Sequence, residues 1–398
     1  MLSVIHFSNQ VVPGGAAKAA RSIHASLVQA GVQSRMAHTP MRSFTDKIWA
    51  IVRAYYDKVP LQLYRNRQRT AFSTANTGIP LKKLTEGAPA DIHHLHWVHD
   101  GYMGFNQMKA LSRMPGRKVI SLHDSWWITG GCNVTHGCDR WMQGCGACPQ
   151  LQSSSSNDFS ARHLEKKRRQ VQALKPVIIC ASRWMYERVK QSPVMQGLQV
   201  ERVPYPIDTA VFKPLQKSVA RELLNLPADK KLILFGAVDI DDANKGYAFF
   251  RHAVNRLNDD NIEVVIFGNT DPARLQLNKK VHLTGRLHDE ITLALAYNAA
   301  DVFVAPSLED NFPNTVLESI ACGIPVTAFA IGGMPDMVEH EKNGYLAAKG
   351  DVDDMIHGIQ RCLEQQQNMS TFARAKTLRE FTYEAVAAQL ISIYHSGI

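Results

Sequence analysis

The residues with the clearest chemical potential lie in one loop and in the helix expected to follow it. Asp310 and Glu318 stand eight positions apart, in a segment that follows an apolar strand and ends at Gly323. Ligands of parallel α/β sheets bind outside the carboxyl ends of strands, so both carboxylates are expected to face one ligand pocket. Glu318 also has a purely structural interpretation, because Thr315-x-x-Glu318 has the spacing of a capping box.

Three other loops that follow expected strands carry groups suited to a polar ligand. Gly14-Gly15 precedes a helix whose N-terminus would attract an anion, although such a pair is often only a turn. His123 is suited to bonding a sugar hydroxyl or a phosphate, with Trp126 and Trp127 offering ring faces to a sugar; the alternative is a satisfied, partly buried histidine. Lys245 is suited to a diphosphate, although an isolated lysine is usually just solvated.

Four of the seven cysteines lie within a stretch of seventeen residues, at Cys132, Cys138, Cys145 and Cys148. The Cys145-x-x-Cys148 spacing and the count of four thiols favour a closed structural zinc site. An iron–sulfur cluster and redox disulfides are the alternatives, and His136 is a spare candidate ligand. The remaining cysteines occur in apolar settings and are expected to be buried thiols.

The elements that must position these groups alternate between apolar strands and helices in both halves of the chain. A helix is expected from Ala16 to Ala30, closed by Gly31. The expected strands are Ser3–Phe7, Ile92–Trp97, Lys118–Leu122, Val177–Cys180, Lys231–Phe235, Glu263–Phe267, Val281–Leu283, Asp301–Ala305 and Pro325–Ala328. This alternation predicts two doubly wound, Rossmann-like α/β domains that face each other across a cleft.

The proline-rich stretch 203–208 is suited to a linker between the two domains. We therefore expect an N-terminal domain over 1–205 and a second domain over 206–375. A final helix over 376–398 is expected to pack back on the first domain. At 398 residues, 45% hydrophobic and 20% charged, the chain has the composition of a globular protein of this size.

Charge is distributed unevenly. Residues 1–205 hold 27 Lys+Arg and 11 Asp+Glu, a balance of +16, whereas 206–398 hold 18 and 25, a balance of −7, which together give +9. The first half is thus expected to meet a nucleic acid or an anionic membrane surface, unless clusters such as 166–169 are only solvated helix faces. No apolar run reaches the roughly 18 residues of a membrane span, and the first twelve residues lack signal-peptide features. These features predict a cytoplasmic protein with reduced thiols.

The stretch from Ala305 to Val326 resembles the signature of retaining GT-B glycosyltransferases of family 4, the glycosyl transferases group 1. Gly14-Gly15, His123, Lys245 and Gly332-Gly333 also fall in the family's order. The resemblance implies that Glu318 binds the nucleotide ribose and that Lys245 contacts the diphosphate. By the same resemblance, the acceptor would bind the domain over 1–205 and the nucleotide sugar the domain over 206–375. The implied catalytic residues are His123, Asp310 and Glu318. The implied donor-binding residues are Gly15, Lys245, Arg286, Asn311, Phe312, Pro313, Asn314, Thr315 and Glu318.

The chain departs from the family pattern at two places. Asp310 stands where the family has a glutamate, and Gly236-Ala237-Val238-Asp239 stands where an arginine usually follows the strand. Diphosphate binding would then depend on Lys245 and Arg286. The implied reaction retains the anomeric configuration without an enzyme nucleophile and needs no catalytic metal, because positive charge and helix N-termini stabilise the leaving diphosphate.

The cysteine insert is similar to a branch of family 4 associated with exopolysaccharides such as colanic acid. That branch implies a GDP- or UDP-sugar donor and a lipid-linked oligosaccharide acceptor at the inner face of the cytoplasmic membrane, with no nucleic acid as partner. Other proteins of the same architecture, a nucleotide-sugar epimerase or a phosphorylase, remain alternatives. A non-enzymatic nucleic-acid-binding module is a further alternative, which predicts salt-sensitive affinity.

Overall fold

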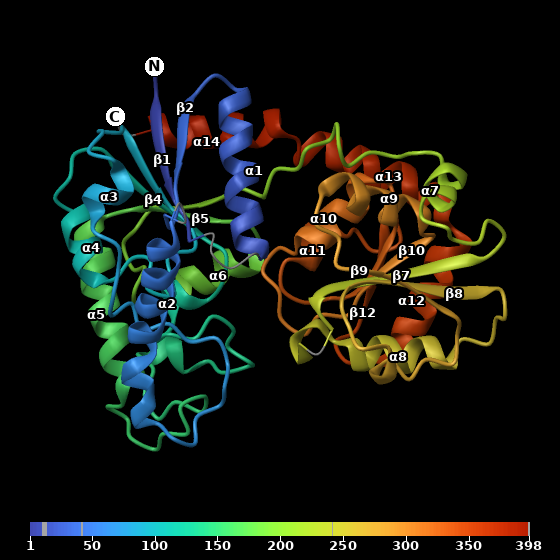
Figure 1. Ribbon diagram of the computed structural model, residues 1–398, viewed down its shortest axis with the longest axis horizontal. Helices are drawn as coiled ribbons and strands as arrows, with labels where there is room; N and C mark the ends of the chain where they lie inside the picture. The colour runs from blue at the N-terminus through green and yellow to red at the C-terminus, as the bar shows by residue number, and fades with distance from the viewer. Residues whose placement is uncertain (10–13, 41–42, 241, 397–398) are drawn as a thin grey trace. The chain divides into compact units, whose positions relative to one another are not determined.

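The computed structural model describes residues 1–9, 14–40, 43–240 and 242–396, so Pro13 of the predicted glycine loop lies outside the described residues. The chain divides into two compact units (Figure 1). Unit 1 contains residues 1–204 and 387–398, and unit 2 contains residues 205–386. Within the described residues, no helix is both long enough and apolar enough to cross a bilayer.

Unit 1 is built on a six-stranded parallel sheet with the order β2-β1-β3-β4-β5-β6. Its central strands β1, β3, β4 and β5 are almost completely buried, as expected where helices cover both faces. The strands are β1 (Ser3–Phe7), β2 (Gln33–Ala37), β3 (Ile92–Leu95), β4 (Arg117–Leu122), β5 (Val177–Cys180) and β6 (Val200–Arg202). The helices are α1 (Gly15–Gln29), α2 (Phe44–Lys58), α3 (Leu81–Thr85), α4 (Phe105–Leu111), α5 (Phe159–Leu174), α6 (Arg183–Gln191) and, from Ala387 onward, α14 (Tyr383–His395).

Unit 2 repeats this architecture with a second parallel sheet, ordered β12-β11-β10-β7-β8-β9. Its strands are β7 (Lys231–Asp239), β8 (Ile262–Asn269), β9 (Val281–Gly285), β10 (Val302–Ala305), β11 (Val326–Phe329) and β12 (Gly344–Ala347). Its helices are α7 (Lys217–Leu223), α8 (Tyr247–Arg256), α9 (Glu290–Ala299), α10 (Asn314–Ala321), α11 (Met334–Met337), α12 (Val352–Glu364) and α13 (Gln366–Glu380). The predicted α/β class with two doubly wound sheets is confirmed.

All nine predicted strands exist, but some of their bounds were wrong. The strand predicted to reach Trp97 ends at Leu95, and the strand predicted to end at Phe235 continues to Asp239. The three strands that the sequence did not predict, β2, β6 and β12, all lie at sheet edges. Strands β2 and β6 are only partly buried and contain polar and charged residues, so they lack the continuous apolar run that identifies a buried strand. Strand β12 is mostly buried, but it is only four residues long and begins at Gly344.

The end of the chain also differs from expectation. The single helix predicted over 376–398 is divided, because α13 ends at Glu380 and α14 begins at Tyr383. Residues from Ala387 onward belong to unit 1. Within unit 1 the buried hydroxyl of Tyr394 lies 2.7 Å from His94 Nδ1, which ties α14 to β3.

Candidate functional site

Two loops meet at the carboxyl end of the unit 2 sheet. Lys245 ends the short turn that follows β7, and Asp310 lies in the loop that follows the neighbouring strand β10. The Lys245 Nζ and Asp310 Oδ2 atoms are 2.8 Å apart. The Asp310 carboxylate raises the pKa of Lys245, so the ammonium keeps its charge at neutral pH.

Close backbone packing holds this pair. Gly246 has φ +72°, and a Cβ there would lie 1.9 Å from the carbonyl oxygen of Pro306. Gly332 has φ +53°, and its Cβ would lie 1.8 Å from the carbonyl oxygen of Asp310. Only glycine fits such approaches, so these two positions set how near the lysine turn and the 332–333 loop come to the acidic loop.

Glu318 is 2% exposed and accepts a hydrogen bond of 2.8 Å from the hydroxyl of Tyr297 on α9. The capping-box interpretation of Glu318 was wrong. Helix α10 begins at Asn314 with Pro313 as its N-cap, and no side chain caps it. Thr315 is therefore already inside the helix, which removes it from the cap position.

The residues between the two acids divide into core and surface positions. Asn311 and Phe312 are buried, and the Phe312 ring packs edge-on against Tyr205 at 5.3 Å between centroids. Asn314 and Thr315 are half-buried at the start of α10. The Phe312 side chain thus anchors the loop in the core of unit 2, and its backbone is the part suited to a ligand.

Arg286 follows β9 directly and is exposed. Strand β9 is the edge strand of the sheet, separated from β7 by β8. Arg286 is therefore at the same carboxyl end of the sheet as Lys245, two strands away.

In unit 1, Gly15 is the first residue of α1. It is exposed, and it follows the extended Gly14 N-cap.

Histidines form a buried chain at the carboxyl end of the unit 1 sheet. His6 Nδ1 lies 2.9 Å from His96 Nε2, and His96 Nδ1 lies 3.0 Å from His123 Nε2. Burial lowers the pKa of His6 to about 3, and burial lowers that of His123 to about 4 despite the opposing charge of Asp124. At neutral pH these rings are uncharged and pass hydrogen bonds along the chain to His123.

His6, His94 and His96 have ring nitrogens within 4.8 Å of one another, a spacing that a metal site requires. Hydrogen bonds already use the nitrogens of two of the three rings. His94 bonds Tyr394 and Ser121, and both nitrogens of His96 bond other histidines. Hydrogen bonding therefore accounts for the cluster.

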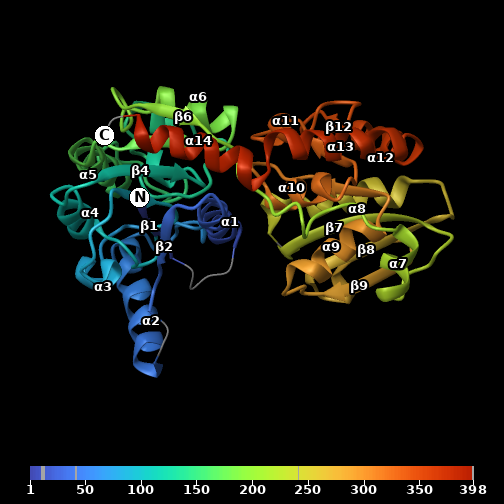
Figure 2. The same cartoon turned by 90° about the horizontal axis from the view of Figure 1, so that it is seen from above.

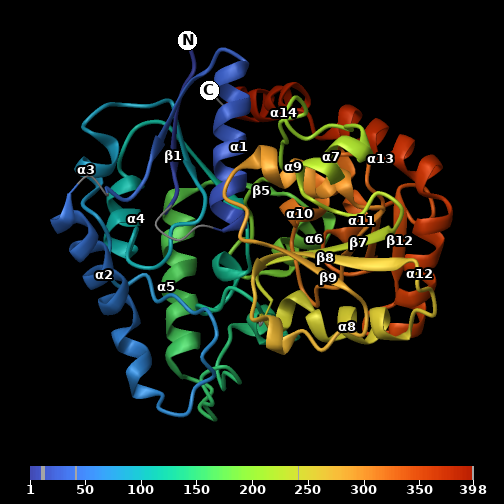
Figure 3. The same cartoon turned by 45° about the vertical axis from the view of Figure 1, so that its right-hand side comes forward.

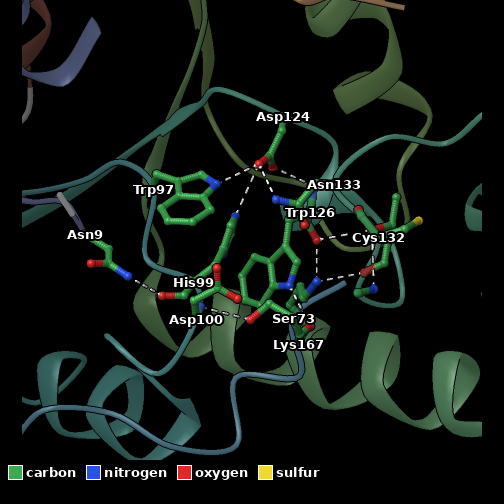
Figure 4. Close-up of polar contacts among 12 residues, drawn as sticks. Asn9, Ser73, Trp97, His99, Asp100, Asp124, Trp126, Cys132, Asn133 and Lys167 are labelled. Atoms are coloured by element: carbon green, nitrogen blue, oxygen red, sulfur yellow. Dashed lines mark hydrogen bonds and ion pairs between the residues drawn. The ribbon is translucent and has the colours of Figure 1, made fainter. Parts of the chain in front are cut away.

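Asp124 is the centre of a polar network beside this chain (Figure 4). Its carboxylate accepts bonds from Trp97 Nε1 at 3.0 Å and Asn133 Nδ2 at 2.9 Å, and His99 Nε2 lies 3.4 Å away. Burial raises the pKa of Asp124, but His99 and the accepted hydrogen bonds outweigh burial and lower it overall. Asp124 is therefore an anion that fixes the rings around it.

The expectation that Trp126 and Trp127 present ring faces to a sugar was wrong. Both side chains are buried, at 0% and 1% exposure, and Trp126 Nε1 donates to the carbonyl of Ser73. The Lys167 ammonium lies 3.6 Å from the Trp126 ring centroid (Figure 4). These indoles belong to the core of unit 1, whereas Trp97 is only half-buried.

A polar cavity of about 250 Å³ opens beside the Asp124 network. The cations Lys58, Arg67 and Arg69 line it together with Trp97 and the chain segment before Phe72. Lys58 Nζ lies 3.4 Å from Asp100, which also lines the cavity. This combination of an indole with several cations suits a ligand that carries both a sugar and phosphate.

The four cysteines Cys132, Cys138, Cys145 and Cys148 line one cavity of about 20 Å³, which has room for one small occupant. All four are unpaired thiols, and burial raises the pKa of Cys132 and Cys145 to about 12. Among the described residues, the three histidines are the only group of three or more His, Cys, Asp or Glu side chains whose ligand atoms all lie within 4.8 Å of one another. The cysteine side chains therefore converge on one space, and closing a metal site would draw the sulfurs nearer together.

Sequence reasoning missed His96, Asp124 and the arginines of the unit 1 cavity. A signal for His96 was present, because His94 and His96 alternate along the expected strand and so share one face. His6 pairs with His94 in the strand register, which brings β1 into the same group. Nothing in the sequence links Arg67 or Arg69 to Trp97, since only the fold joins those segments.

Residues 229–365, within unit 2, match the family described as Glycosyl transferases group 1. Among curated proteins the chain is 26% identical over 213 residues to the MMP alpha-(1->4)-mannosyltransferase of Mycolicibacterium hassiacum, a match that covers 50% of this chain and 49% of the relative. The chain thus spans about half the length of this relative, and the same holds for several D-inositol 3-phosphate glycosyltransferases.

Solved structures match over the whole chain. Sucrose-phosphate synthase from Thermosynechococcus elongatus has a TM-score of 0.66 at 19% identity, covering 99% of this chain and 98% of its own. HepE from Anabaena, solved in complex with UDP-glucose, has a TM-score of 0.64 at 16% identity and covers 100% of both chains. The two six-stranded parallel sheets follow the architecture of these proteins, so the chain has the GT-B fold, and the match to the group 1 glycosyltransferases lies in unit 2.

Proposed function

We propose that this chain is a retaining glycosyltransferase that moves a sugar from a UDP- or GDP-sugar to a lipid-linked oligosaccharide in exopolysaccharide, capsule or O-antigen synthesis. The observation that carries the proposal is the Lys245–Asp310 pair at the carboxyl edge of the unit 2 sheet, inside the region that matches the family. A cation held at that edge is suited to a diphosphate, and the neighbouring carboxylate is suited to sugar hydroxyls.

In this proposal each donor-site group has one task. Lys245 stabilises the negative charge that develops on the leaving diphosphate, with Arg286 as a second cation. Glu318 binds the ribose hydroxyls, and the backbone of Asn311–Thr315 with Asp310 holds the sugar. Retention follows when the acceptor hydroxyl attacks from the face on which the diphosphate leaves.

The acceptor is assigned to unit 1. Burial lowers the pKa of His123 and keeps its ring neutral, and one of its ring nitrogens is hydrogen-bonded to His96. A neutral imidazole is suited to bonding a sugar hydroxyl rather than an anion. The cavity with Lys58, Arg67 and Arg69 is suited to the diphosphate of a lipid-linked acceptor. We place the protein at the inner face of the cytoplasmic membrane, where such acceptors are displayed.

The first test is donor binding. It is measured as the change in unfolding temperature when UDP-, GDP-, ADP- or TDP-sugars are added. A ligand of the folded state raises the unfolding temperature, and Lys245→Met is expected to weaken that binding about tenfold or more because the diphosphate loses its cation. The control is Lys342→Met. Lys342 also pairs with a carboxylate of unit 2, its side chain is 61% exposed, and its loss should leave donor binding unchanged. No shift with any nucleotide, or an unaltered affinity in Lys245→Met, would contradict the proposal.

A second prediction concerns Glu318. We expect Glu318→Ala to abolish transfer, because its carboxylate is assigned to the ribose hydroxyls. The variant also leaves the buried Tyr297 hydroxyl without its partner, at a stability cost of about 1–3 kcal/mol. Tyr297→Phe removes the same hydrogen bond but keeps the carboxylate, so it should retain transfer. Wild-type turnover by Glu318→Ala would refute the assignment.

The histidines of unit 1 predict a pH dependence of stability. His6 and His123 of the hydrogen-bonded chain, together with buried His93 outside that chain, have pKa values of about 3, 4 and 4, well below the 6.5 of the unfolded state. The unfolded chain thus binds more protons between about pH 4 and 6.5, so stability is complete above this window and falls as pH drops through it.

Each such histidine contributes up to about 1.4 kcal/mol per pH unit within the window. Denaturant unfolding at several pH values measures the slope, which His93→Phe should reduce by about one proton. Exposed His252 provides the control, since His252→Gln should not alter the slope. A stability that stays flat from pH 7 to pH 4.5 would show that these rings are not held neutral.

We also propose that the four cysteines hold a structural zinc ion, because they line a single small cavity. Purified full-length protein should contain about one zinc, and Cys145→Ser/Cys148→Ser should lose it. Cys362→Ser alters a buried thiol of unit 2 and should keep the metal. A folded, metal-free protein with four titratable thiols in 132–148 would overturn this assignment.

A further inference from the structure

Helix α2 turns its apolar side toward solvent. Phe44, Ile48, Ile51 and Tyr55 follow one another at steps of four, three and four residues, so they form one stripe along the helix. Their exposed fractions are 77%, 44%, 70% and 59%. Trp49 and Tyr56, at 60% and 55%, are exposed on one flank of the helix, roughly a third of a turn from the stripe. Of nineteen exposed large hydrophobic side chains in the described residues, eight lie between Phe44 and Leu63.

The opposite side of α2, which packs on unit 1, is polar. Asp57 is fully buried, and its carboxylate accepts bonds from Ser73 Oγ at 2.7 Å and from the backbone N–H of Asn76 at 2.9 Å. The Arg53 carbonyl accepts a bond from Thr77 Oγ1 at 3.0 Å. A helix on a globular surface normally buries its apolar face, so this arrangement is inverted. Figure 2 shows α2 projecting from the rest of unit 1.

Positive charge borders the exposed stripe. Residues 44–69 contain six basic and two acidic side chains. Both acids are bonded within the chain, Asp46 to the Ser43 N-cap and Asp57 as described above. Lys47 is exposed beside the stripe, and Arg65 and Arg69 are exposed beyond the end of the helix. The segment therefore combines an apolar face, aromatic side chains and unmatched cations.

We propose that α2 lies in the surface of an anionic lipid bilayer, with its Phe44–Tyr55 stripe among the acyl chains. Trp49 and the two tyrosines are suited to the headgroup level, and Lys47 can extend its ammonium to lipid phosphates. A second copy of the chain is a poorer occupant of this face, because pairing two such helices would bring like-charged borders together. An anionic surface instead neutralises them.

The position of α2 also suggests where the acceptor's diphosphate binds. This part of the inference rests on the proposed function. Lys58 ends the helix and lines the polar cavity of unit 1 with Arg67 and Arg69 (Figure 3 shows α2 on the same unit as α5). An acceptor whose lipid stays in the bilayer would thus place its diphosphate at the end of the docked helix.

The test is co-sedimentation of the full chain with vesicles of phosphatidylcholine containing about 30% phosphatidylglycerol, compared with phosphatidylcholine alone. We expect binding to the anionic vesicles that weakens as salt is raised. Ile51→Ser/Tyr55→Ser should reduce that binding at least tenfold, since it removes two apolar side chains from the centre of the stripe. The control is Ile291→Ser/Leu283→Ser, which removes two exposed apolar side chains from unit 2 and should bind as the wild type does.

Donor-induced thermal stabilisation separates this proposal from the proposed function. Ile51→Ser/Tyr55→Ser should keep that stabilisation, because the donor site lies in unit 2. The membrane assignment would be overturned if the wild-type protein did not bind anionic vesicles, or if the double variant bound them as strongly as the wild type. A dimer in sedimentation velocity that the double variant abolishes, without vesicle binding, would assign the face to a second copy instead.

Discussion

The parallel pairing of strands is the constraint on which the candidate site depends. In a parallel sheet every strand ends at the same edge, so loops far apart in sequence meet there. Lys245 and Asp310 are 65 positions apart, yet β7 and β10 are neighbours in the sheet, and their carboxyl ends bring the two side chains to 2.8 Å. Gly246 and Gly332 then allow the backbone contacts that fix this distance. The same constraint brings His6, His96 and His123 together in unit 1.

The two units differ in the charge that they hold at the carboxyl ends of their sheets. In unit 2 a cation is held ready beside a carboxylate, so charge is present before a ligand arrives. In unit 1 burial keeps a row of imidazoles neutral, and the single anion Asp124 is balanced by donors from Trp97, His99 and Asn133. Preorganised charge suits a diphosphate, whereas neutral donors suit hydroxyl groups. This contrast is the basis on which we propose that unit 2 binds the donor and unit 1 the acceptor.

Helix α2 shows how a helix can be stable without burying its apolar face. Its N-terminus is closed by a capping box between Ser43 and Asp46, and its end is tied by the buried Asp57. Hydrogen bonds thus replace the apolar contacts that fix most surface helices. The cysteine segment is comparable in that its loops carry little regular structure, and side chains that converge on a small cavity hold it together.

The sequence by itself determined the fold class and most buried strands, because these depend on local periodicity and residue type. It failed at the edge strands β2 and β6, where partial burial leaves no continuous apolar run, and at β12, a buried strand of only four residues that begins at Gly344. Residue type alone also misjudged Trp126, whose indole is fully buried, and Thr315, which lies inside α10 instead of capping it. Only the tertiary structure decided that Glu318 faces Tyr297, that His96 supports His123, and that the stripe on α2 points to solvent. Those outcomes depend on which elements pack together, and long-range packing is not written in the spacing of residues along one segment.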